Sequence, residues 1–188
     1  MQEKIYLRPL CLNDINERYL FWVNDPSVTE YLKIGKQRLA NSDLVRYVED
    51  SPNKGRHNYA IITKNSQQHI GNGSVYLIEL DKSKFEIGYF IGEKEFWGGH
   101  YSSILIFNLL KIGFIEMGLD KCIGYVEEAH VKARMTNKFS GYKEIKKIKQ
   151  YNEKVNRNVN IIGIEISKKD WLKNTEVLCS EYPELYEV

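Results

Sequence analysis

The order of segments over residues 85–126 constrains the fold of this chain more than any other feature. Apolar and polar side chains alternate over residues 85–91, which predicts a strand, and an apolar helix is predicted from residue 102 to residue 117. A second strand is predicted over residues 121–126. A strand, a helix and a strand in this order form a crossover unit, and its two strands lie parallel to each other.

The other segments predict an antiparallel meander and further helices around this crossover. Strands are expected over residues 5–10, 59–63, 70–80, 144–151 and 160–167. Helices are expected after the caps Asn13-Asp14 and Asn41-Ser42-Asp43, over residues 130–139, and, as a short terminal helix, from Asp170. The sequence therefore predicts an α+β fold in which helices flank a mixed, mostly antiparallel sheet.

Length and charge limit the domain organisation and the class of partner. The chain has 188 residues, 27 of them Lys or Arg and 25 Asp or Glu, so its formal net charge is +2. This length predicts one domain over residues 1–188, with a C-terminal tail over residues 175–188 that could pack on a partner subunit, forming a homodimer, or fray. The balanced charge argues against a nucleic-acid partner. The lysines of residues 143–149 instead fit an exposed strand whose edge they protect.

Cysteine usage and hydropathy point to a cytoplasmic protein. The three cysteines, Cys11, Cys122 and Cys179, are far apart and include no Cys-x-x-Cys pair, so neither a disulfide framework nor a metal site is expected. The N-terminus carries no secretory signal pattern. The most apolar stretch, residues 104–117, is too short to span a bilayer, so no membrane partner is expected.

The loop before the apolar helix is the first candidate binding element. Its residues are Trp97, Gly98, Gly99, His100, Tyr101, Ser102 and Ser103. Glycines let several backbone N–H groups point at one spot, and the helix dipole favours an anion there, so the loop could bind phosphate. A plain turn and helix cap is the alternative. The loop matches neither Gly-x-Gly-x-x-Gly nor Gly-Lys-Ser/Thr, which argues against a Rossmann domain and a nucleoside triphosphatase.

Six segments in order resemble the motifs of one family. They are residues 5–15, 22–28, 85–91, 96–103, 131–142 and 161–171. Together they resemble the GNAT superfamily of acyl-CoA-dependent N-acetyltransferases, and within it the branch of ribosomal-protein alanine acetyltransferases and several aminosugar acetyltransferases. The resemblance covers nearly the whole chain. It implies a GNAT-like sheet whose central pair of parallel strands splays apart.

The resemblance also implies a co-substrate, acetyl-CoA, and the residues that hold it. The pyrophosphate would lie on the loop of residues 97–103, and the pantetheine arm would bond to the main chain of Tyr89, Phe90 and Ile91. His100 stands where the family has a central glycine, which matters if the position needs a positive φ.

Catalytic and acceptor residues follow from the same resemblance. Glu86 is the candidate base, directly or through water, with a solvent-facing carboxylate or a structural ion pair as the alternative. His130 and Asn137 would lie near the leaving thiolate, although His130 could simply cap a helix and Asn137 cannot supply a proton. Trp22, Asn24, Tyr31 and Tyr76 could line the acceptor side; core packing is the alternative for Trp22.

Three functions stay open on the sequence. The preferred one is acetylation of a small primary amine, with an amino sugar carried on a nucleotide as the acceptor class. The second is acetylation of a protein N-terminus. The third is CoA binding without turnover, which the departures His100 and Asn137 motivate.

Overall fold

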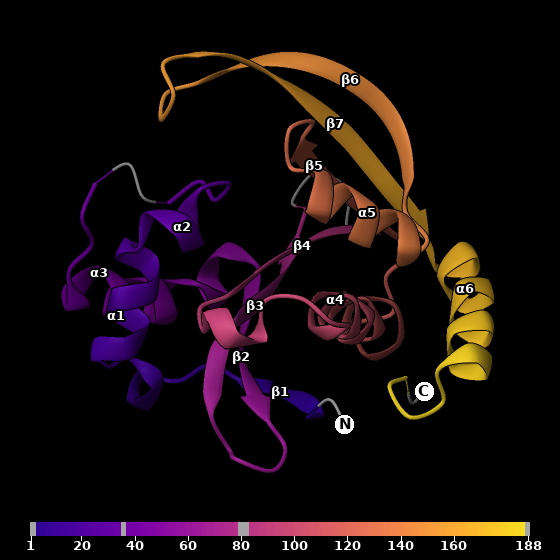
Figure 1. Ribbon diagram of the computed structural model, residues 1–188, viewed down its shortest axis with the longest axis horizontal. Coiled ribbons are helices and arrows are strands. Elements are labelled where there is room, and N and C mark those ends of the chain that lie inside the picture. Colours follow the sequence, from indigo (N-terminus) through magenta and orange to yellow (C-terminus); the bar gives the residue numbers. More distant parts are fainter. Residues whose placement is uncertain (1–2, 35–36, 79–82, 187–188) are drawn as a thin grey trace. The chain divides into compact units, whose positions relative to one another are not determined.

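The computed structural model describes residues 3–34, 37–78 and 83–186, with the elements labelled in Figure 1. The strands are β1 (Ile5–Pro9), β2 (Arg56–Thr63), β3 (His69–Leu77), β4 (Lys84–Ile91), β5 (Lys121–Glu127), β6 (Lys143–Asn152) and β7 (Arg157–Ser167). The helices are α1 (Glu17–Asn24), α2 (Pro26–Thr29), α3 (Asn41–Asp50), α4 (Tyr101–Lys111), α5 (Val131–Phe139) and α6 (Lys168–Glu181). Every predicted strand and helix is found, with shifted ends. The last two residues of the strand predicted over 70–80 lie outside the described residues.

The seven strands form one hydrogen-bonded sheet in the order β1-β2-β3-β4-β5-β7-β6. β4 and β5 are parallel, whereas the pairs β1–β2, β2–β3, β5–β7 and β6–β7 are antiparallel. The predicted mixed, mostly antiparallel sheet is confirmed. The parallel pairing covers only three residue pairs and ends at Glu86 and Ile123, although both strands continue. This early end is the splay that the family resemblance implies.

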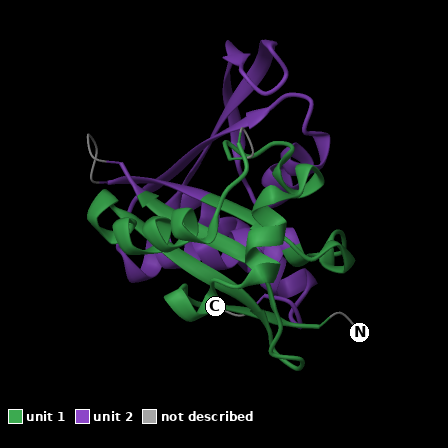
Figure 2. Ribbon diagram, turned by 90° about the vertical axis from the view of Figure 1, so that its left-hand side faces the viewer, with its two compact units in different colours: residues 1–76, 88–101 green, residues 77–87, 102–188 purple. Residues whose placement is uncertain are grey.

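The chain forms two compact units, coloured separately in Figure 2. Unit 1 consists of residues 1–76 and 88–101, and unit 2 of residues 77–87 and 102–188. β4 contributes its first half to unit 2 and its second half to unit 1. The single catalytic domain expected over the whole chain stays a prediction.

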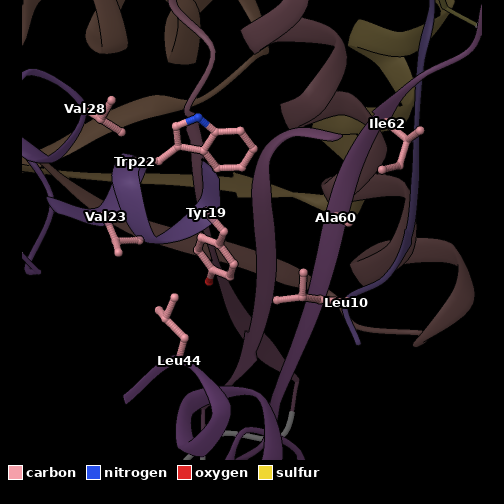
Figure 3. Close-up of a cluster of buried hydrophobic side chains, with 8 residues drawn as sticks. All are labelled: Leu10, Tyr19, Trp22, Val23, Val28, Leu44, Ala60 and Ile62. Carbon is pink, nitrogen blue, oxygen red and sulfur yellow. The ribbon is translucent and has the colours of Figure 1, made fainter. Parts of the chain in front are cut away.

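An aromatic core built on α1 holds unit 1 together. Tyr19, Trp22 and Val23 follow one another at helical spacing and are at most 3% exposed. In Figure 3 they lie with Leu10, Ala60 and Ile62 of the strand side and with Leu44 of α3. Their burial anchors α1 and α3 to the strands.

The cap predicted for α1 at Asn13-Asp14 is wrong. The helix begins at Glu17, and the side chain of Asn16 accepts the backbone N–H of Tyr19 at 3.0 Å. Asp14 is engaged elsewhere: its two carboxylate oxygens accept two guanidinium N–H groups of Arg8 at 2.7 and 2.6 Å, and one of them also accepts the backbone N–H of Cys11. Burial alone would raise the pKa of Asp14, but these hydrogen bonds outweigh it and lower the pKa to about 2.

Unit 2 is built around α4, which is buried on nearly every side. The predicted helix over 102–117 is regular only to Lys111 and continues as a π-helical turn over Ile112–Glu116. Phe85 and Phe114 meet edge to face at 5.0 Å between ring centroids. A Cβ on Gly113 would lie 2.3 Å from the Phe85 ring, so only glycine lets the end of this helix approach β4.

The C-terminal region differs from its prediction. α6 begins at Lys168, not Asp170, because Ser167 caps it by accepting the backbone N–H of Asp170 at 3.1 Å, and it runs for 14 residues, so it is not short. The segment beyond it does not fray at Tyr186. This residue is 2% exposed, and its hydroxyl donates to Ser103 Oγ at 2.9 Å.

β6 is the last strand of the order and is exposed along nearly its whole length. Its lysines face solvent as predicted, and Ile145 and Ile148 are also exposed. A register shift between Glu144 and Lys146 adds a bulge, which discourages pairing with another chain. No helix within the described ranges is long and apolar enough to cross a bilayer.

Replacing Gly113 by alanine should destabilise unit 2. The new methyl group would overlap the buried Phe85 ring, and overpacking of this kind costs about 1–3 kcal/mol. Urea unfolding measures the loss. Gly124→Ala is the matched control, since its nearest neighbour would lie 3.4 Å away in ordinary contact. Equal stability of the two variants would contradict the close packing.

Asp14→Asn should remove a pH-dependent part of the stability. The pKa of Asp14 falls from its ordinary range to about 2 on folding, so its contribution is present above about pH 4 and is lost as the pH falls towards 2. The free energy of unfolding should be about 2 kcal/mol lower in the variant than in the wild type at pH 7, and this difference should shrink below pH 4. Asp50→Asn, which removes an exposed pair with Lys54, should change little. A pH-independent difference would contradict this account.

Candidate active site

The loop between β4 and α4 takes its shape from two glycines. Gly98 has φ +110° and Gly99 has φ +54°. A Cβ on Gly98 would meet no atom within 4 Å, so the residue is needed for its conformation and not for space. The non-glycine residues with positive φ in the described part of the chain are Gln67 and Asn156, so His100 is not among them. His100 therefore occupies the family's glycine position without left-handed strain.

Trp97 ties this loop to the end of β4. Its indole N–H donates to the carbonyl of Ile91 at 2.7 Å. The Lys94 ammonium lies 5.8 Å from the centre of the Trp97 ring and pairs with Asp25 at 2.7 Å. One acceptor position of the Ile91 carbonyl is therefore already occupied, and the backbone of the loop is held by a side chain.

The first residues of α4 differ in what they can offer a ligand. The Tyr101 ring packs on Phe96 edge to face, at 5.2 Å between centroids. In unit 2, Ser103 is 6% exposed and accepts the hydroxyl of Tyr186. Ser102 is half-buried and lies at the surface side of the same turn.

The second half of β4 can offer a ligand its main-chain groups rather than its side chains. The Phe90 ring lies 6.3 Å from Tyr19 and 6.4 Å from Trp22, between centroids, and so belongs to the core of unit 1. Ile91 is buried. Burial raises the pKa of Tyr89 to about 12, so its hydroxyl keeps its proton at neutral pH.

The residues present fit the diphosphate of acetyl-CoA. Gly98 and Gly99 are exposed, and the left-handed conformations turn their backbone sharply ahead of a helix of 11 residues. The first N–H groups of a helix have no partner within it, and its dipole favours an anion at that end. Backbone groups would hold the diphosphate, so the histidine at position 100 would not prevent binding.

The catalytic candidates Glu86, His130 and Asn137 all belong to unit 2. Glu86 is half-buried on β4, opposite Ile123 in the last parallel pair. No hydrogen bond or ion pair to the Glu86 carboxylate is found across residues 3–34, 37–78 and 83–186, so the ion-pair alternative has no support there.

His130 and Asn137 lie on α5. His130 occupies the N-cap position, but its side chain makes no cap hydrogen bond, so capping does not explain the residue. Asn137 lines a depression of about 600 Å³ whose other residues include Arg134, Tyr142 and Ile164.

The thiol of Cys122 in unit 2 is not a nucleophile. It is buried beside the hydroxyl of Tyr142, at 3.1 Å, and burial raises its pKa to about 12. A thiol with this pKa stays protonated at neutral pH. Covalent catalysis through Cys122 is therefore disfavoured.

The four acceptor candidates belong to unit 1 and divide into two pairs. Trp22 is 1% exposed and contributes to the core, as its packing alternative predicts. The Asn24 side chain donates to the carbonyls of Leu20 and Leu39 and accepts the N–H of Leu39, so it fixes the chain before α3. Tyr31 is 37% exposed, and Tyr76 is half-buried.

Sequence reasoning missed a cationic residue beside Tyr76. The Arg56 guanidinium carbon lies 4.3 Å from the centre of the Tyr76 ring. Arg56 and Asn58 alternate with exposed His57 at the start of β2, where the same face continues with buried Ala60. Polar residues on the inward face of a strand are the signal that could have identified them.

Comparison with known proteins identifies the family. A model described as "Acetyltransferase (GNAT) domain" matches residues 4–143.

The chain belongs to the GNAT acetyltransferase family.

The GNAT chain also resembles individual proteins over nearly its full length. It is 25% identical over 173 residues to an "Uncharacterized N-acetyltransferase p20" of Bacillus licheniformis, which covers 90% of this chain and 96% of that protein. A GNAT-family acetyltransferase structure from Bacillus anthracis has a TM-score of 0.75 at 17% identity, covering 89% of this chain and 96% of that one. A spermidine N-acetyltransferase from Vibrio cholerae, solved with CoA and spermine, has a TM-score of 0.78 at 17% identity, covering 90% and 98%. At these identities the two structures establish the fold.

The family match makes this chain an acyltransferase, an acetyl-CoA-dependent N-acetyltransferase of the GNAT type. Acetyl-CoA is therefore its co-substrate. In the described residues, no group of three or more His, Cys, Asp and Glu side chains could hold a metal ion.

Gly98→Ala should weaken CoA binding more than His100→Ala. An alanine at φ +110° is strained by about 1–3 kcal/mol, so the loop would give up its backbone shape. His100 has no such conformation to lose. Titration calorimetry with CoA should show Kd raised about tenfold by Gly98→Ala and less than threefold by His100→Ala.

Melting temperatures separate a local change in the loop from a global one. A loop that changes its backbone conformation relieves the strain locally, so neither variant should unfold at a much lower temperature. A larger loss of affinity in His100→Ala would show that the imidazole, and not the glycine backbone, holds the diphosphate.

Proposed function

We propose that this GNAT enzyme acetylates the primary amine of a small molecule, with an amino sugar carried on a nucleotide as the preferred acceptor. The observation that carries the proposal is the Glu86 carboxylate. It sits at the last residue pair of the β4–β5 ladder and has no ion-pair partner in the described part of the chain. A carboxylate held by strand geometry and left unpaired suits a group that receives a proton.

Glu86 would act as the base for the acceptor. An alkylamine has a pKa near 10 and is mostly ammonium at neutral pH, so it must lose a proton before it can attack. The Glu86 carboxylate would take that proton directly or through one water molecule.

The other candidates would bind and orient the reactants. Acetyl-CoA, when bound, supplies an activated acetyl thioester. Backbone N–H groups of residues 98–103 would hold its diphosphate, and main chain at Tyr89 and Phe90 would align its arm. His130 could donate a proton near the departing sulfur, and Asn137 could donate a hydrogen bond there.

The two alternative functions, CoA binding without turnover and acetylation of a protein N-terminus, are not equally supported. CoA binding without turnover rested on His100 and Asn137, and the ordinary backbone of His100 removes one of these two reasons. Acetylation of a protein N-terminus keeps the same chemistry and differs only in the acceptor. A cytoplasmic location is supported by the free thiols of Cys11, Cys122 and Cys179, which a reducing compartment preserves.

Thiol release from acetyl-CoA over a panel of amines tests the proposed function. The panel contains amino-sugar nucleotides, peptides with free N-termini and spermidine. Turnover with the sugar nucleotides and not with peptides supports the proposed acceptor. Stabilisation by acetyl-CoA in a thermal shift without release of thiol from any amine would favour the non-catalytic alternative.

Glu86→Gln should lower kcat by about 100-fold or more, because general base catalysis contributes roughly that much. The amide has nearly the same shape, so the Kd for CoA should change less than threefold. Glu116→Gln, at an exposed position of the same unit, is the control and should retain full turnover. Parallel losses in kcat and in CoA affinity would remove Glu86 from the base role.

A further inference from the structure

Arg56 contacts two tyrosine rings within unit 1. Its guanidinium carbon lies 4.3 Å from the centre of the Tyr76 ring and 5.1 Å from that of Tyr47. Arg56 and Tyr76 are directly opposite each other on β2 and β3, while Tyr47 comes from α3. Cation–π contacts from two separate elements fix the position of this guanidinium.

Among the described residues, none accepts a hydrogen bond from the same guanidinium. Its Nε is buried without a hydrogen-bond partner, and no carboxylate or carbonyl in the described part of the chain pairs with the group. Arg8 and Arg134, in contrast, pair with Asp14 and Glu144 at 2.6 and 2.7 Å. Burying the Nε–H group without an acceptor is costly, and an anion bound by the guanidinium would offset that cost.

The polar neighbours of the cluster are already engaged with one another. Asn58 Oδ1 accepts the hydroxyls of Tyr47 and Ser74 at 2.9 and 2.8 Å, and Asn58 Nδ2 donates to Ser51 Oγ at 2.8 Å. This network locks the Tyr47 ring in place. The oxygens of Tyr47, Asn58, Ser51 and Ser74 are therefore hydrogen-bonded to one another.

Tyr76 connects the cluster to β4. A Cβ on Gly88 would lie 3.0 Å from the Tyr76 hydroxyl oxygen, so the tyrosine packs directly on the backbone of that strand. Gly88 stands between Glu86 and Tyr89 in the sequence, the two residues proposed to meet the amine and the co-substrate. Within unit 1, a single side chain, Tyr76, therefore separates Arg56 from the backbone of β4 at Gly88.

We propose that Arg56, oriented by Tyr76 and Tyr47, binds an anionic group on the acceptor amine, either a carboxylate or a phosphate. This inference rests on the proposed acetyltransferase function and narrows its substrate class. A guanidinium presents a planar fork of N–H donors that matches both anions, and it repels a polycation. The acceptor is therefore an amine that also carries a negative charge, and a polyamine is disfavoured.

Matched pairs of acceptors test this assignment by steady-state thiol release. Glucosamine and glucosamine 6-phosphate differ by a phosphate, alaninamide and alanine by a carboxylate, and spermidine represents the polycations. In the wild type, kcat/KM should be at least tenfold higher for the anionic member of one pair, and that pair identifies the anion. Spermidine should be the poorest substrate.

Arg56→Gln should raise KM for the preferred anionic amine about tenfold or more and leave kcat and the KM of its neutral partner within twofold. Arg56→Lys keeps the charge but not the fork, so it should retain part of the preference. Arg46→Gln, an exposed position on α3, is the control and should behave as wild type.

Two results would overturn the inference while leaving the acetyltransferase intact. They are the absence of any preference in both pairs, and an equal effect of Arg56→Gln on anionic and neutral amines. Absence of thiol release with every amine would refute the proposed function instead. In that case calorimetric titration of glucosamine 6-phosphate and alanine into wild type and Arg56→Gln decides the matter: binding that depends on Arg56 supports the anion site, and no such binding refutes it.

Discussion

The short parallel pairing of β4 with β5 is the constraint on which the chemistry of this GNAT enzyme depends. It ends after three residue pairs, at Glu86 and Ile123. A parallel pair requires a crossover, and α4 provides it, so the loop before α4 must start where β4 ends. The indole of Trp97 fastens that loop to the Ile91 carbonyl. One strand therefore carries the candidate base near its beginning and the anchor of the anion-binding loop at its end.

Local patterns in the sequence were enough to predict the order of elements, the mixed sheet and the family. Alternation along β4 and helical spacing in α1 are properties of neighbouring residues, so they survive without knowledge of the fold. The predictions that failed depended on side-chain contacts that residue type and spacing do not specify. Asp14 looked like a cap, but Arg8 holds it, and Trp22 has the same helical spacing whether it lines a site or a core.

The candidate site was less predictable, because its decisive features are backbone conformations and polar side chains that lack a partner among the described residues. The sequence could show a histidine where the family has glycine, but not that Gly98 and Gly99 take up the positive φ angles ahead of it. Nor could it show that the Glu86 carboxylate has no ion partner among the described residues or that Arg56 lies on two tyrosine rings. The contacts of Arg56 depend on which residues come together from β2, β3 and α3, and no local pattern specifies that.

The proposed role of Arg56 concerns substrate chemistry, which the structural likeness does not specify. The fold matches a spermidine N-acetyltransferase with a TM-score of 0.78, yet at 17% identity the likeness extends only to the backbone. Arg8 shows what this chain does with a partly buried arginine that serves structure alone: it supplies a carboxylate, Asp14, and both oxygens are used. At Arg56 the described residues supply two aromatic rings and no carboxylate. Because an unpaired cation lowers stability, the arrangement is explained if the missing charge arrives with the acceptor.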